Sequence, residues 1–296
     1  MTGAGSGEFG FALEDSYGNL PADPEWIQPF IDPEVGSASL DRSLNRARKP
    51  GDPRPAGSRP GNREGALTVT GTIANTDYHD LVFADGGTTL ASEAMLAPTA
   101  TWYLGSQTLP DMEERFATGA AVESVTWNWQ QGEDVTVELN IIYGDEADLA
   151  TPSTISQPAV GDVSGSYATT FEIDAASVEM LQSLTLEIAG MARFRRGQQQ
   201  TPVDAVVGAY EPSMTVEAVL QDGTKKSLVY GSSSASTPQD EIDTSPATLT
   251  FNNAAGEIAT YNIQDIQPTS YDWSNLISSD DTVDPTEFHV RTVEVA

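Results

Sequence analysis

Two stretches in the middle of the chain alternate hydrophobic and polar residues with the period of a β-strand. The hydrophobic positions are Val125, Trp127 and Trp129 in the first stretch and Val135, Val137, Leu139, Ile141 and Tyr143 in the second. A polar QQGED sequence separates the two stretches and is typical of a turn. The pattern therefore predicts a β-hairpin whose large hydrophobic side chains share one buried face.

Shorter hydrophobic stretches predict further strands on both sides of this hairpin. Before it, LTVTGTIA places Leu67, Val69 and Ile73 on one face, with Gly71 at a bulge or a close approach. After it, the predicted strands are Phe171–Ile173, Leu184–Ile188, Met214–Leu220, Leu228–Tyr230, Leu249–Phe251 and Ile258–Ile263. In the last stretch, FHVRTVEV, the hydrophobic positions change parity after Val290, which indicates a bulge. The pattern predicts roughly nine or ten strands in all.

One short helix is expected at residues 76–84, TDYHDLVFA. Thr76 is a candidate N-cap, and Leu81, Val82 and Phe83 are expected to face inward. With one or two such helices among many short strands, the fold class is mainly β, an antiparallel sandwich or barrel with long loops.

Residues 1–66 are expected to be irregular and extended. Gly and Pro are dense there, and the stretch KPGDPRPAGSRPGNREG cannot form a central strand or a helix interior. Trp26 and Phe30 are too hydrophobic for a solvated tail, so this arm docks either on its own core or on a neighbouring subunit. We therefore divide the chain into an N-terminal arm with a basic loop, 1–66, and a β core, 67–296.

Composition and charge exclude several classes of protein. The 296 residues include 44 Asp and Glu, 14 Lys and Arg, two His and no Cys, for a formal net charge of −30. Without Cys there is no disulfide or thiolate site, and two His disfavour a zinc or Ser-His-Asp centre. No hydrophobic run is long enough to span a membrane, and the first residues lack the features of a secretory signal. The overall charge repels DNA.

The basic residues are almost all arginine, which favours a source adapted to molar salt. Only Lys49, Lys225 and Lys226 are lysines. At 1 M salt the Debye length is ~3 Å, so dense like charge is tolerated. The alternative is an ordinary acidic protein.

Ten of the basic residues gather in two short segments, 42–63 and 193–196. They are Arg42, Arg46, Arg48, Lys49, Arg54, Arg59 and Arg63 in the first, and Arg193, Arg195 and Arg196 in the second. The first segment holds no aromatic residue for stacking on bases. We expect both segments to lie on the acidic body of another copy of the chain. The alternatives for the first segment are a contact with DNA and a flexible loop.

Other candidate chemistry is weaker. With 44 carboxylates, any catalytic pair can be chosen by eye, so a glycosidase has no specific support. The acidic groups at 145–148 and 280–284 lack the spacing of a calcium loop and are expected to be solvated. His79, beside Asp77 and Asp80, is expected at the surface. The tryptophans of the central hairpin are expected in the core rather than on a platform that stacks with sugars or bases. We expect no catalytic residue, no metal and no cofactor.

The order of these features resembles the tail tube proteins of tailed phages and archaeal tailed viruses. The opening GFALEDSYGNLPADPEWIQPFIDPEVGSASLDRSLNRARKPGDPRP is similar to the family's opening, with an acidic, aromatic and Gly-containing lead at 14–18. GALTVTGTIANTDYHDLVF is similar to its first core strand and short helix. The segment from TWYLGSQ to YGDEA, which includes Gly119, is similar to its central unit, and SLTLEIAGMARFRRGQQQTPVDAVVGAYEPSMTVEAVLQDG to a strand, an arginine-bearing loop and a return strand.

The resemblance implies a structural virion protein with a β-sandwich of the tail tube type and no active site. Family members form hexameric rings that stack into a hollow tube, which holds the tape-measure protein and later passes the viral DNA to the host. The implied partners are other copies of the chain and other tail proteins at the tube ends. The resemblance implies no insertion of this chain into a membrane. The implied place is the virion tail, assembled in the host cytoplasm, and the charge suggests a halophilic archaeal host. Two alternatives remain: another virion or surface β-protein (tail-tip, capsid-decoration or adhesion module), and a halophilic carbohydrate-active enzyme.

Overall fold

The chain folds almost entirely into antiparallel β-strands. The computed structural model describes residues 7–48, 50–51, 54–84, 87–90, 95–106, 114–221, 223–277 and 281–296. Its strands are β1 (Gly7–Leu13), β2 (Ile31–Arg48), β3 (Pro55–Thr72), β4 (Ala100–Ser106), β5 (Arg115–Gln130), β6 (Thr136–Tyr143), β7 (Asp145–Ala147), β8 (Thr170–Ile173), β9 (Ala176–Ser177), β10 (Leu181–Ala189), β11 (Ala192–Arg195), β12 (Asp204–Val207), β13 (Glu211–Ala218), β14 (Ser245–Asn253), β15 (Gly256–Tyr271), β16 (Thr286–His289) and β17 (Thr292–Val295). The helices are α1 (His79–Val82) and α2 (Thr224–Val229), with 3-10 turns at Val160–Asp162 and Ser166–Ala168.

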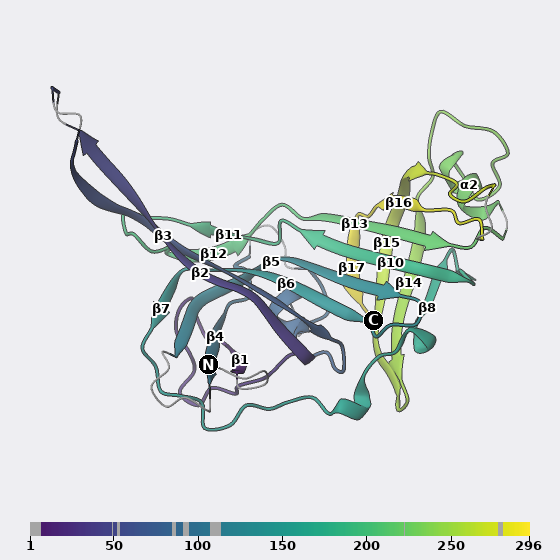
Figure 1. Cartoon of the computed structure of the whole chain (residues 1–296). Coiled ribbons are helices and arrows are strands. Elements are labelled where there is room, and N and C mark those ends of the chain that lie inside the picture. Colours follow the sequence, from purple (N-terminus) through teal and green to yellow (C-terminus); the bar gives the residue numbers. More distant parts are fainter. Residues whose placement is uncertain are drawn as a thin grey trace.

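One large sheet dominates the molecule and curves around its core (Figure 1). Its strands follow the order β2-β3-β6-β5-β10-β13-β16-β15-β14-β8-β9, and β1, β4, β7 and β17 attach at its sides. Two long strands make the curvature. β5 pairs with β4 and β7 through its first half and with β6 and β10 through its second, and β15 pairs with both β16 and β14. This confirms the mainly-β antiparallel sandwich class.

The core confirms most of the predicted strands. The alternating residues of β5 and β6 are buried, with Val125, Trp127, Val135, Val137 and Leu139 all at 0% exposure. The two tryptophans therefore belong to the core, as expected. Gly71 makes the expected close approach, because a Cβ there would collide with the Cβ of Phe30.

A buried polar cluster anchors the short helix α1 to the sheet. Trp127 Nε1 donates to Tyr78 Oη at 2.8 Å, and Tyr78 Oη lies 2.8 Å from Tyr261 Oη. His79 Nε2 is 2.8 Å from the same Tyr261 oxygen, and only 5% of His79 is exposed. The expected surface position of His79 is therefore wrong: it bridges α1 to β15. Thr76 is not the N-cap either, since that position falls at Tyr78.

Three expectations about the C-terminal half are also wrong. Residues 228–230 belong to the end of helix α2 rather than to a strand, because the preceding TKKS starts a helical turn. The parity change in FHVRTVEV is not a bulge: Val290 and Arg291 separate β16 from β17, which pair with different segments of β15. RFRR is not a loop, since Ala192–Arg195 pairs with β12 in a small second sheet. The strand count is also higher than expected, at seventeen in the described residues.

Residues 1–66 are more regular than expected. β1 pairs with β4, and β2 pairs with β3 in a hairpin of two 18-residue strands. Residues 55–65 of the Pro-rich stretch belong to β3, and most of them lie in the hairpin outside the pairing with β6. β3 continues through residue 66, and Phe9, Phe11 and Phe30 belong to the main core. The division of the chain into an arm, 1–66, and a core, 67–296, stays a prediction.

No helix in the described ranges has the length and hydropathy of a membrane span.

Candidate assembly surface

The hairpin β2–β3 leaves the body of the molecule, and only its root is part of the sheet. β3 pairs with β6 from Gly65 to Thr72, whereas its pairing with β2 continues outward as far as Arg48 and Pro55. The outer part, described at residues 42–48, 50–51 and 54–62, is thus a two-stranded ribbon that projects past the sheet (Figure 1). An isolated two-stranded ribbon is marginally stable in water, so this part is favoured by a partner surface. We call it the hairpin tip.

Most of the predicted interface arginines lie on the hairpin tip and face solvent. Arg42, Arg46, Arg48, Arg54 and Arg59 are exposed, as is Leu44 at 58%. Within the described part of the chain, Arg42, Arg46, Arg48 and Arg59 have no carboxylate within ion-pair distance. Lys49 lies outside the described residues. The tip thus presents positive charge at these four arginines that no ion pair of the described residues neutralises.

The register of the hairpin places like charges opposite each other. Arg42 pairs with Arg63, and the next position pairs Asp41 with Glu64. Like charges directly opposite in a β-ladder destabilise it. Both pairs are compensated within the chain, because Arg63 forms an ion pair with Asp145 and Glu64 forms one with Arg196.

The remaining predicted arginines make ion pairs inside the chain. Arg63 pairs with Asp145 in β7, Arg196 pairs with Glu64 in β3, and Arg195 pairs with Asp204 across β11 and β12. The backbone N–H of Arg63 also donates to the carbonyl of Gln200 at 2.9 Å. These contacts connect the root of the hairpin to the segment 193–204. Arg193 is exposed and has no ion pair among the described residues.

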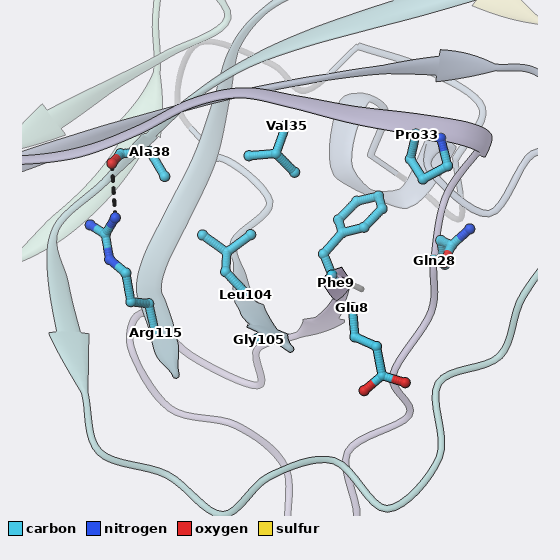
Figure 2. A pocket seen from close by; sticks show the side chains of 10 residues that line it. Glu8, Phe9, Gln28, Pro33, Val35, Ala38, Leu104, Gly105 and Arg115 are labelled. Atoms are coloured by element: carbon cyan, nitrogen blue, oxygen red, sulfur yellow. Dashed lines mark hydrogen bonds between the residues drawn. The ribbon is translucent and has the colours of Figure 1, made fainter. Parts of the chain in front are cut away.

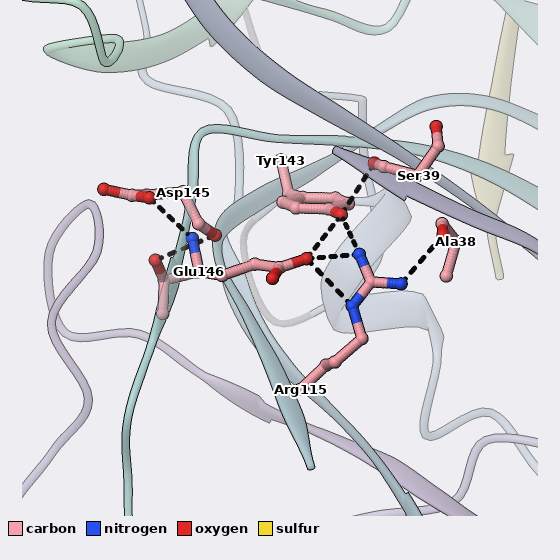
Figure 3. A network of polar contacts seen from close by, with 7 residues as sticks. Ala38, Ser39, Arg115, Tyr143, Asp145 and Glu146 are labelled. Atoms are coloured by element: carbon pink, nitrogen blue, oxygen red, sulfur yellow. Dashed lines mark hydrogen bonds and ion pairs between the residues drawn. The ribbon is translucent and has the colours of Figure 1, made fainter. Parts of the chain in front are cut away.

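A second network, which the sequence did not reveal, fixes β2 to the sheet (Figure 3). Arg115 forms an ion pair with Glu146 and donates to the backbone carbonyl of Ala38 at 2.8 Å. Tyr143 Oη accepts from Arg115 at 3.0 Å and donates to the carbonyl of Ser39 at 2.7 Å. The hydrogen bond to Glu146 raises the pKa of Arg115, while desolvation, followed by the effect of Glu146, raises the pKa of Tyr143. Both groups therefore keep one charge state across ordinary pH.

A groove of about 500 Å³ opens beside this network, between β2 and the pair β1–β4 (Figure 2). Phe9, Val35 and Leu104 line its centre, with Glu8 towards one end and Arg115 at the other. The guanidinium of Arg115 at this end is already paired with Glu146. The groove lies beside β2, whose outer edge pairs with no strand in the described residues.

Trp26 and Phe30 are accounted for within the chain. Trp26 is 8% exposed and packs edge-on against Tyr103 and Phe116, and Phe30 is 0% exposed and lies against Tyr78. Of the two alternatives for the arm, its own core holds these two side chains. They have little surface left to offer another copy, so the assembly surface proposed below omits them.

Three of the acidic residues considered for cation binding form ion pairs within the chain, and buried Asp284, which pairs with Lys225, is not the solvated acid that was expected. Asp145 and Glu146 pair with arginine side chains, while Asp280 lies outside the described residues. No group of three or more metal-ligating side chains occurs in the described ranges.

These observations define a class of protein: an all-β structural subunit with an unpaired sheet edge and a charged hairpin outside its core. Residues 6–287 match the family model described as phage tail tube protein, and the chain belongs to this family. It is a structural protein of a viral tail. No curated protein matches the chain.

Proposed function

We propose that copies of this chain join side by side into six-membered rings, and that the rings stack into a hollow tube through which the viral genome is delivered. The unpaired edge of β2 supports ring formation. It belongs to an 18-residue strand at one end of the sheet order, and the two-residue strand β9 ends the other. A ring can cover such edges by contacts between subunits, which an isolated chain leaves open to aggregation.

The hairpin tip supports stacking and is the single observation that carries the proposal. It projects beyond the sheet, and four of its arginines (Arg42, Arg46, Arg48 and Arg59) have no ion pair among the described residues of a chain of net charge −30. A second copy offers an abundant acidic surface. The tip would therefore bind the next ring through charge-assisted hydrogen bonds, which persist at high salt because they act at contact distance.

The same charge bears on the contents of the tube. An acidic lumen would repel viral DNA and prevent it from adhering during passage. We propose that the tape-measure protein occupies the lumen before the genome, that other tail proteins bind the tube ends, and that assembly takes place in the host cytoplasm. The scarcity of lysine and the excess of carboxylates favour a halophilic archaeal host.

Electron microscopy of the purified protein in molar salt tests this function. We expect rings and hollow tubes whose end views show sixfold symmetry. A particle that remains monomeric at every concentration would contradict the proposal. Rings of another symmetry would refute only the subunit number.

A further inference from the structure

The end of the molecule opposite the hairpin tip carries a compact projection, which we call the knob. It consists of helix α2, the loop 230–244 and the segment 271–277, and it lies across the sheet from the hairpin (Figure 1). Backbone hydrogen bonds join Gln239 to Tyr230 at 2.8 Å and Asp243 to Gly231 at 2.8 Å. Lys225 of α2 forms a buried ion pair with Asp284 and donates to its carbonyl at 3.0 Å. Specific hydrogen bonds and a buried ion pair therefore hold the knob in one conformation.

The knob exposes large hydrophobic side chains. Ile277 is 97% exposed, Leu276 58%, Trp273 42% and Ile242 40%. The ring of Trp273 is held in place by Tyr271, edge-on at 6.2 Å, and by the Lys226 ammonium at 5.9 Å. An ordered tryptophan beside exposed aliphatic residues is typical of a contact surface, since single scattered hydrophobic residues need no such support.

The knob and its margin also expose carboxylates. The exposed acidic residues of the knob and its margin are Asp240, Glu241, Asp243, Asp272 and Asp281. Lys225 and Lys226 are engaged by Asp284 and by aromatic rings. The knob therefore exposes both carboxylates and large hydrophobic side chains.

The hairpin tip has the complementary composition. Its exposed arginines flank Leu44, which is 58% exposed on β2. Arginine recognises carboxylates through paired hydrogen bonds, and a hydrophobic contact is not screened by salt. The combination suits molar salt, where attraction beyond ~3 Å is lost.

We propose that the knob of one copy is the receptor for the hairpin tip of another copy. The inference rests on the stacking role proposed above and names the surface that receives the tip. Because tip and knob lie at opposite ends of one chain, their contact is head-to-tail and leaves a free tip and a free knob at every step. Such a heterologous contact can propagate along an axis, as a tube requires, when its rotation does not close into a ring, whereas an isologous contact would stop at a dimer.

A charge exchange tests the pairing. The tip variant carries Arg42→Glu, Arg46→Glu and Arg48→Glu, and the knob variant carries Asp240→Arg, Glu241→Arg and Asp243→Arg. We expect each variant alone to raise the protein concentration needed for tubes at least about tenfold, the factor that corresponds to one lost charged contact. The chain carrying both sets should form tubes near the original concentration. A matched control, Asp15→Arg, Asp23→Arg and Glu25→Arg, makes the same charge change on exposed residues of the N-terminal segment and should leave tubes unchanged.

Cross-linking gives an independent readout, because the chain has no cysteine of its own. Leu44→Cys combined with Ile277→Cys, treated with a bismaleimide, should give a ladder of covalent multimers beyond the dimer. Leu44→Cys combined with Tyr167→Cys, at a residue that is 84% exposed outside the knob, should not. If the original chain forms tubes but charge exchange fails to restore them and no ladder appears, the knob is not the receptor. If the original chain forms no tubes at all, the proposed function itself fails.

Discussion

At the scale of single residues, three basic side chains on the body of this acidic protein make specific contacts. Lys225 is buried against Asp284, Lys226 lies over the rings of Tyr230 and Trp273, and Arg115 holds the backbone of β2. A buried ion pair adds little net stability compared with a hydrophobic pair, but losing one partner is costly. These positions therefore serve to fix particular geometries.

His79 makes the stability of the fold depend on pH. Burial lowers its pKa from 6.5 to about 4. The unfolded chain binds a proton at this site near pH 6.5, while the folded chain does not until about pH 4. The free energy of unfolding due to His79 is therefore fully present above pH 6.5 and declines as the pH falls to about 4, by about 3 kcal/mol.

Chemical denaturation at several pH values measures this effect. The variant His79→Gln cannot titrate and keeps a polar group beside Tyr261. We expect the difference in unfolding free energy between the original chain and the variant to shrink between pH 7 and pH 4. A difference that is constant over this range would show that His79 does not remain neutral in the fold.

At the scale of elements, the bend in β5 depends on one glycine. Gly119 has φ +61°, and it lies where the pairing with β4 shifts register between Ala100 and Trp102. Its N–H donates to Glu14 at 2.8 Å, and a Cβ there would lie 2.6 Å from the ring of Tyr17. The turn at 14–18 thus packs directly on the bend, which allows β5 to serve both halves of the core.

Replacing this glycine tests the bend. Gly119→Ala should lower the free energy of unfolding by about 2–5 kcal/mol, from the left-handed backbone and the collision with Tyr17 together. Gly132→Ala is the matched control, because Gly132 has φ +85° but nothing within 4 Å of an added Cβ. The free energy of unfolding of this variant should fall only by the cost of a left-handed backbone at alanine, about 1–2 kcal/mol. Equal losses at both positions would contradict the packing of Tyr17 on β5.

The strands that the sequence predicted are those with one face in the core. Alternation at Val125–Trp129 and Val135–Tyr143 exists because one side of β5 and β6 is buried. The outer half of the β2–β3 hairpin has no buried face, so it shows no alternation, and its prolines obscure it further. Proline is tolerated there because the ribbon has free edges. His79 was misplaced because its burial depends on Tyr261, 182 residues away.

The candidate assembly surface could be predicted from the sequence only in part, because contacts between distant segments are not visible there. The clustering of arginine at 42–63 and 193–196 is visible in composition alone. Which arginines stay unpaired is not, because Arg63, Arg195 and Arg196 find carboxylates only after β3, β7, β11 and β12 come together. The knob was missed because its parts, from α2 to residue 277, are separated by strands β14 and β15.

At the scale of the whole molecule, the net charge of −30 opposes contact between copies of the chain. Copies of such a chain repel each other at low salt, and molar salt removes this repulsion beyond ~3 Å. Contacts then depend on groups that touch. The hairpin tip holds Arg42, Arg46, Arg48 and Arg59 away from the body, and none of the four has an ion pair in the part of the chain that the structure describes, so we propose that rings stack there.

Shortening the hairpin tests this central claim most directly. Residues 43–62 are replaced by Asn-Gly, a two-residue turn that joins Arg42 to Arg63, which already face each other in the register. All pairing of β2 and β3 at the body remains, so the variant should fold with an unchanged unfolding midpoint. In electron micrographs at molar salt, we predict single rings and no tubes. Tubes as long as those of the original chain would contradict the account.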